Sequence, residues 1–116
     1  MRAESDNHVN LAVVVGEVAR DATRVDMGDG RVFTNFDLVS REGGVRTVVP
    51  VTYEGDMEIA AGELVAVSGH VNKRFFASGS GMASRTDVRA DKVTIVRRRD
   101  QVSRFMAGVM KGLGSR

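Results

Sequence analysis

The sequence predicts an all-β domain, a barrel of five strands with one short helix between the third and fourth, followed by a C-terminal helix. Three observations lead to this expectation. The 116 residues are 42% hydrophobic and 28% charged, which suits one domain with its own core. Up to residue 96, short valine-rich runs alternate apolar and polar positions between glycine-containing turns. Beyond that point the apolar spacing becomes helical.

The first two strands are predicted at residues 8–24 and 31–40, joined by a hairpin loop at residues 26–30. Gly16 lies inside the first run, where a bulge or tight bend uses a residue without Cβ. In the second run the apolar positions share one face, and they are Val32, Phe36 and Leu38. That face is predicted to be buried.

The third strand is predicted at residues 45–53, after the two-residue turn Gly43-Gly44. Pro50 cannot donate to a hydrogen-bonded ladder, so this strand is expected to be an edge strand or locally irregular. Residues 56–61 are predicted to form a turn or two of helix.

The last two strands are predicted at residues 63–76 and 85–96, with a flexible loop at residues 77–84. The apolar phase of the final strand slips between Ala90 and Val93, which predicts a β-bulge there. Three strands, a short helix and two more strands is the order of an OB-fold barrel. A generic five-stranded sheet or another small barrel shares this order.

Residues 97–116 are predicted to form a basic amphipathic helix, opening with Arg97-Arg98-Arg99 and with Asp100 as N-cap. Its apolar positions recur at helical spacing, at Val102, Phe105, Met106, Val109, Met110 and Leu113. We expect this stripe to pack on the chain's own barrel or on a sister subunit. A groove on a partner protein and an anionic membrane surface are the other candidate partners.

Charge is distributed unevenly along the chain. Residues 1–70 hold 6 arginines against 12 acidic residues, a net charge of −6, whereas residues 71–116 hold 11 basic residues against 3 aspartates, a net charge of +8. One end of the fold should therefore carry a positive field, which is typical of a protein that binds a polyanion. A solvated basic surface fits the same count.

Five pieces of the predicted barrel, in order, resemble the bacterial single-stranded-DNA-binding protein family over about the first 96 residues. They are Gly16 with Arg20-Asp21 and Arg24, Asn35-Phe36-Asp37-Leu38, Tyr53, the run from Gly69 to Phe76, and Arg85-Thr86 followed by Ala90-Asp91-Lys92-Val93. The resemblance implies an OB fold, a homotetramer, and a role in DNA replication, repair or recombination.

Three departures set the chain apart from that family. It has no tryptophan to present to the bases, and the loop between the second and third strands shrinks to Arg41-Glu42-Gly43-Gly44. The basic helix replaces the family's long linker with its acidic tip. The chain is best interpreted as a divergent paralogue lacking the acidic C-terminal tail.

Binding a strand irrespective of sequence requires cations along the phosphates and flat side chains for stacking, worth roughly 1–3 kcal/mol per base. Phe75 and Phe76 are adjacent on a strand, so they point to opposite faces, one expected in the core and the other exposed or at a subunit contact. The resemblance selects Phe76 for stacking. Tyr53 is either a stacking residue or a half-buried tyrosine, and Phe33 could face either way. The candidate cations lie on strands or at strand ends, and they are Arg24, Arg46, Lys73, Arg74 and Arg85.

No catalytic constellation is recognisable. His70 has no cysteine, second histidine or acidic residue at ligand spacing, which favours a structural role. We therefore expect no enzymatic activity, no metal and no cofactor. The lack of cysteine and of a signal-peptide core near the N-terminus favours the cytoplasm, in association with the nucleoid.

The sequence thus predicts that residues 1–96 bind single-stranded DNA along a basic, aromatic-bearing groove, with RNA an alternative polymer. The competing hypothesis is an assembly or adaptor module that has lost strong strand binding.

Overall fold

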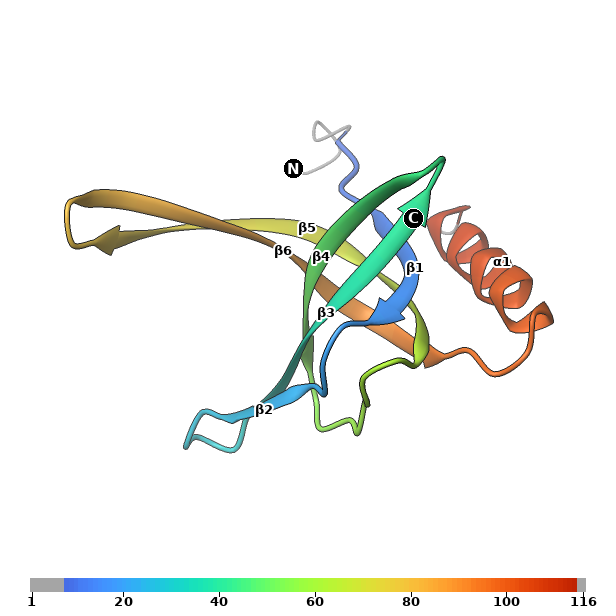
Figure 1. Ribbon diagram of the computed structural model, residues 1–116, viewed down its shortest axis with the longest axis horizontal. Coiled ribbons are helices and arrows are strands. Elements are labelled where there is room, and N and C mark those ends of the chain that lie inside the picture. The colour runs from blue at the N-terminus through green and yellow to red at the C-terminus, as the bar shows by residue number, and fades with distance from the viewer. Residues whose placement is uncertain (1–7, 115–116) are drawn as a thin grey trace, which may run out of the picture.

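The computed structural model describes residues 8–114, which form six strands and one helix (Figure 1). The elements are β1 (Ala12–Val18), β2 (Thr23–Asp26), β3 (Val32–Glu42), β4 (Val45–Glu54), β5 (Leu64–Ser78), β6 (Gly81–Ile95) and α1 (Asp100–Gly114). The strands form one mixed sheet in the order β1-β5-β6-β4-β3-β2, and β1 also pairs with β3. Five strands therefore make a nearly closed ring. The expected β-rich class with a C-terminal helix is confirmed at this level.

The first predicted strand is two strands, because residues 19–22 leave the ladder between β1 and β2. Gly16 lies where β1 crosses closest to β3, and a Cβ there would sit 2.6 Å from the carbonyl oxygen of Val39. This close approach, and not the expected bulge, requires a residue without Cβ, because β1 and β5 pair through Gly16 with no register shift. The close approach lets Glu17 pair with Val39, which closes the ring.

The short helix expected at residues 56–61 is wrong. Instead of bonding to one another in helical turns, the backbone groups of this segment bond to the β1–β2 connection. The Ala22 amide donates to the carbonyl of Ile59 at 2.9 Å, and the Ala61 amide donates to the Asp21 carboxylate at 2.9 Å. The Ile59 side chain is 4% exposed and packs in the core.

The core lies inside the ring and is formed by one face of each main strand. Its buried residues are Val18, Phe36, Leu38, Val51, Ile59, Val65, Val67 and Val88. The predicted inward face of residues 31–40 is confirmed, with Phe36 5% exposed and Leu38 fully buried. Pro50 also matches its expectation, because β4 has β6 as a second neighbour only from Val51 to Tyr53.

The flexible loop expected at residues 77–84 is wrong as well. β5 and β6 continue as one long antiparallel hairpin to the pair Ser78 and Gly81. The segment Lys73–Thr86, which we call the arm, stands off the barrel (Figure 1). Every residue of the arm is exposed except half-buried Ala83. The β-bulge expected near Ala90 is confirmed, because Ser68 pairs with Lys92 but Gly69 pairs with Ala90, leaving Asp91 as the extra residue.

Helix α1 packs on the chain's own barrel, which is one of the arrangements expected from the sequence. Phe105 is 3% exposed, and the Lys92 ammonium of β6 lies 5.0 Å from its ring centroid. Met106 and Met110 of the same stripe stay exposed. Within residues 8–114 no helix combines the length and apolar character needed to span a membrane.

Candidate nucleic-acid interface

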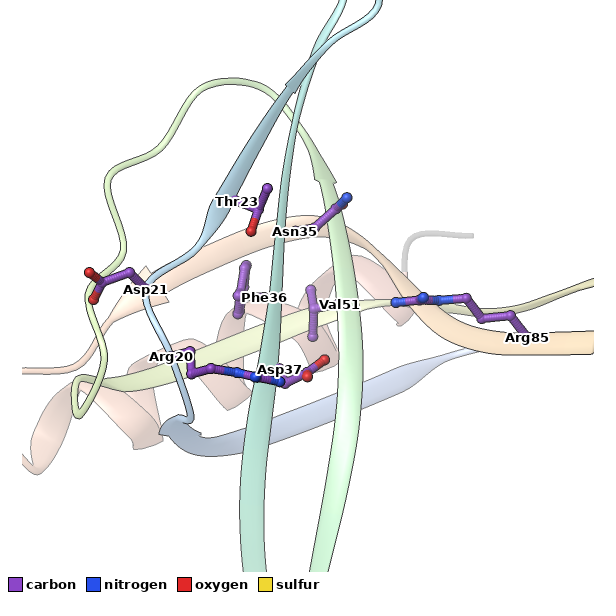
Figure 2. A pocket seen from close by; sticks show the side chains of 8 residues that line it. All are labelled: Arg20, Asp21, Thr23, Asn35, Phe36, Asp37, Val51 and Arg85. Atoms are coloured by element: carbon purple, nitrogen blue, oxygen red, sulfur yellow. The ribbon is translucent and has the colours of Figure 1, made fainter.

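A groove runs over the outer face of β3 and β4 at the base of the arm. It consists of two hollows that share Asn35, and we call it the outer-face groove. The first hollow is shown in Figure 2 and is lined by Arg20, Asp21, Thr23, Asn35, Phe36, Asp37, Val51 and Arg85. The second is lined by Val25, Met27, Arg31, Phe33, Asn35, Thr52, Arg74 and Arg89. Together these linings contain five arginines and two aspartates.

The arm supplies two of these arginines. Arg74 and Arg85 are direct cross-strand partners, so their side chains share one face of the hairpin. Figure 2 shows Arg85 reaching from β6 toward Val51 of β4. Phe76 lies two residues beyond Arg74, on the same face because side chains alternate along a strand, and is 48% exposed. The candidates Arg74, Phe76 and Arg85 are therefore brought together.

Lys73 and Phe75 occupy the opposite face of the arm. The Lys73 ammonium lies 5.5 Å from the Phe75 ring centroid, and Phe75 is 67% exposed. The expectation that either Phe75 or Phe76 is a core residue is wrong, because this part of the hairpin extends beyond the barrel. Lys73 faces away from the groove.

Asp87 is a buried carboxylate at the base of the arm, with only 2% of its surface exposed. It accepts hydrogen bonds from the Thr52 hydroxyl at 2.6 Å and from the Asn72 amide at 3.2 Å. Burial raises the pKa of Asp87, but these hydrogen bonds and the charges of Arg89 and Arg74 outweigh it and hold the pKa below its ordinary value. Asp87 therefore stays ionised and ties the arm to β4.

Two buried polar atoms of the groove have no hydrogen-bond partner among the described residues, Asn35 Oδ1 and Arg89 Nε. The Arg89 nitrogen lies 3.4 Å from an Asp87 carboxylate oxygen, close enough for an ion pair but without hydrogen-bond geometry. Both residues line the second hollow.

Three candidates lie outside the groove. The Arg24 guanidinium is 3.1 Å from the Asp56 carboxylate and 3.8 Å from that of Asp26. Tyr53 is half-buried on the same side of β4 as core residue Val51, and a Cβ on Gly55 would lie 2.7 Å from its ring. Arg46 shares the outer face of β4 but stands six residues before Thr52, roughly 20 Å away at about 3.4 Å per residue.

Arg24 lines a separate hollow, which we call the acidic hollow. Its charged lining is Asp21, Arg24, Asp56, Glu58, Glu63 and Arg97. Across residues 8–114 no group of three or more histidine, cysteine, aspartate or glutamate side chains is arranged to hold a metal ion.

The interpretation of the sequence missed Asn35, Thr52, Asp87 and Arg89 as groove residues. A signal for part of this set exists, because Phe33 and Asn35 alternate with the buried residues of β3 and so must share its outer face. Nothing local indicates that Thr52 meets Asp87, which is 35 residues away in the chain.

Neither protein-family models nor curated proteins match this chain. Its function is therefore inferred from the geometry of the groove and from the residue pattern.

Proposed function

We propose that the chain is an OB-type barrel that binds single-stranded DNA non-catalytically in the outer-face groove and along the arm. The observation that carries this is the basic, aromatic-bearing arm, which contains Lys73, Arg74 and Arg85 and no acidic residue, set beside a groove that three further arginines line. Phosphates need such cations, and bases need exposed rings such as that of Phe76.

The strand order supports the OB assignment. If β1 and β2 are counted as one strand, β3 and β4 are strands two and three, and the arm is the loop between strands four and five. In OB folds the face of strands two and three and the loop between strands four and five are common binding surfaces for oligonucleotides. The outer-face groove lies over that same combination.

The residue pattern supports a narrower proposal, that the chain is a divergent paralogue of bacterial single-stranded-DNA-binding proteins. In this proposal it forms a homotetramer and serves as an accessory in replication, repair or recombination. The segment after the barrel is helix α1, which buried Phe105 holds in place, and the proposed mechanism assigns strand binding to the barrel and the arm.

The test is fluorescence anisotropy with labelled oligodeoxythymidine, a matching RNA and a DNA duplex, each over a salt series. We expect preference for the single strand with a steep salt dependence, because cations displaced from the phosphates are released on binding. Equal, weak binding to all three polymers that disappears at moderate salt would contradict the proposal.

One observation favours the second candidate function, an assembly or adaptor module. The face of the arm that points away from the groove is apolar and exposed, with Phe75 at 67% and Met82 at 71%. Light scattering of the intact chain and of Phe75→Ser with Met82→Ser tests the assembly role of this face. If this face only joins copies of the chain, the mass of the assembly falls in the double variant, and the outer-face groove stays intact. A double variant with unchanged mass would contradict the assembly role.

A further inference from the structure

The second hollow of the outer-face groove has the composition of a pocket for one flat ligand. Phe33 of β3 provides a half-buried ring, and the Arg31 guanidinium carbon lies 5.9 Å from its centroid. Arg31 is paired with Asp29 at 2.9 Å and Arg89 with Asp87 at 3.4 Å, so Arg74 is the lining cation that has no ion pair among the described residues. A ring beside cations suits a nucleobase with its phosphate.

The two unpartnered atoms point to the same ligand class. A buried polar atom without a partner destabilises the fold, and folded proteins contain few of them. Here the residues that carry these buried atoms, Asn35 with an acceptor and Arg89 with a donor, line one hollow. Their complement is a planar group that offers an N–H donor next to an acceptor. The Watson–Crick edge of every nucleobase has an N–H donor next to an acceptor, so such a pocket tolerates any sequence.

We propose that this hollow binds one base of the strand, with Phe33 stacking on the base and Asn35 and Arg89 pairing with its edge. Arg74, opposite Arg85 at the base of the arm, meets the neighbouring phosphate. This inference rests on the proposed function and adds a defined base site to it. It assigns base contact to the barrel surface as well as to Phe76 on the arm.

The test compares a base-bearing strand, oligodeoxythymidine, with an abasic phosphodiester strand of equal length. Asn35→Ala removes an unpartnered acceptor, so the melting temperature should stay the same or rise. Its affinity for oligodeoxythymidine should fall about 3–10-fold, and its affinity for the abasic strand should not change. Phe33→Leu should show the same pattern with a loss of about tenfold. Phe75→Leu, on the far face of the arm, is the matched control.

Retained stability together with a loss specific to the base-bearing strand supports the base site. If Asn35→Ala binds oligodeoxythymidine and the abasic strand as wild type does, the base site is overturned. The proposed function still stands in that case, provided that the wild type prefers single strand over duplex. Equal losses on both strands would likewise overturn it. Wild-type protein with no preference for the single strand over duplex would overturn both proposals at once.

Discussion

The outer-face groove and the acidic hollow adjoin at Asp21, and both contain arginines from strands or strand ends, yet they differ in what surrounds those arginines. In the acidic hollow, Arg24 faces Asp56 and Asp26 within 4 Å. In the groove, Arg74 and Arg85 face each other across the arm, and the buried carboxylate at the base of the arm, Asp87, is already held by Thr52 and Asn72. Neighbouring carboxylates, whether near or distant in sequence, therefore decide which arginine is available to a phosphate.

The two regions also differ in how their backbone is held. The segment at residues 56–61 is tied to the β1–β2 connection by hydrogen bonds and by the buried side chain of Ile59. The arm is held at its base by the Asp87 network and by the close approach of Gly69 to β6. Beyond that base, among the described residues, the arm is supported by its own ladder between β5 and β6.

The largest predicted effect comes from breaking the base of the arm. A Cβ at Gly69 would lie 1.9 Å from the Arg89 carbonyl oxygen, so Gly69→Ala must displace one of the two strands. We expect the free energy of unfolding to fall by about 2 kcal/mol or more. Urea denaturation measures it, with Gly79→Ala at the open tip of the arm as control. Equal stability of the two variants would show that β5 and β6 do not approach closely there.

The comparison of arginines is tested by charge removal. Arg74→Gln with Arg85→Gln should weaken binding to oligodeoxythymidine about 30-fold at low salt, at roughly 1 kcal/mol per exposed contact. The logarithmic salt slope should become shallower by about 1.4, since each contact to a single strand contributes about 0.7. Arg24→Gln is the matched control and should change the affinity little. A loss in Arg24→Gln as large as that in the double variant would remove the distinction between the regions.

Aromatic contact on the arm is tested by Phe76→Ala. Loss of one stacked base should weaken binding about tenfold without changing the salt slope, because no charge is removed. Phe75→Ala, on the other face of the arm, should bind as wild type does. Anisotropy titrations measure the affinity of both variants. A larger loss of affinity in Phe75→Ala would contradict the prediction, because the strand would then lie on the Phe75 face of the arm.

The smallest predicted effect concerns pH. The pKa of Asp87 is lowered in the folded state, so its ionised form stabilises the fold above the unfolded pKa, near 4. That contribution is lost as the pH falls through the lower folded pKa. Wild type should therefore exceed Asp87→Asn in melting temperature at neutral pH, and the gap should narrow below about pH 4. A gap independent of pH would contradict the ionised network.

The sequence predicted much of the barrel because alternation and turn chemistry are local. It identified the inward face of β3 through Phe36 and the bulge at Asp91. It failed where long-range contacts decide the structure. Residues 56–61 do not form a helix, because Asp21 and Ala22 form hydrogen bonds with backbone groups of this segment. Residues 77–84 are not a loop, because the β5–β6 ladder continues to a two-residue turn.

The candidate site was predicted in part. Arg74, Phe76 and Arg85 share one face, a relation that follows from strand alternation once the register of β5 and β6 is known. The pairing of Arg24 with Asp56 depends on a tertiary contact that no local pattern encodes, whereas the inward side of Tyr53 follows from its alternation with Val51. Asn35 and Arg89 stand out only through their missing partners.

The most direct test of the strand's position is a chemical-shift perturbation map of backbone amides on adding oligodeoxythymidine. We predict the largest shifts at residues 33–37, at Thr52 and along residues 72–76 and 85–89, with residues 56–63 of the acidic hollow unmoved. Shifts concentrated at residues 56–63 or in α1, with the outer-face groove unchanged, would contradict the account.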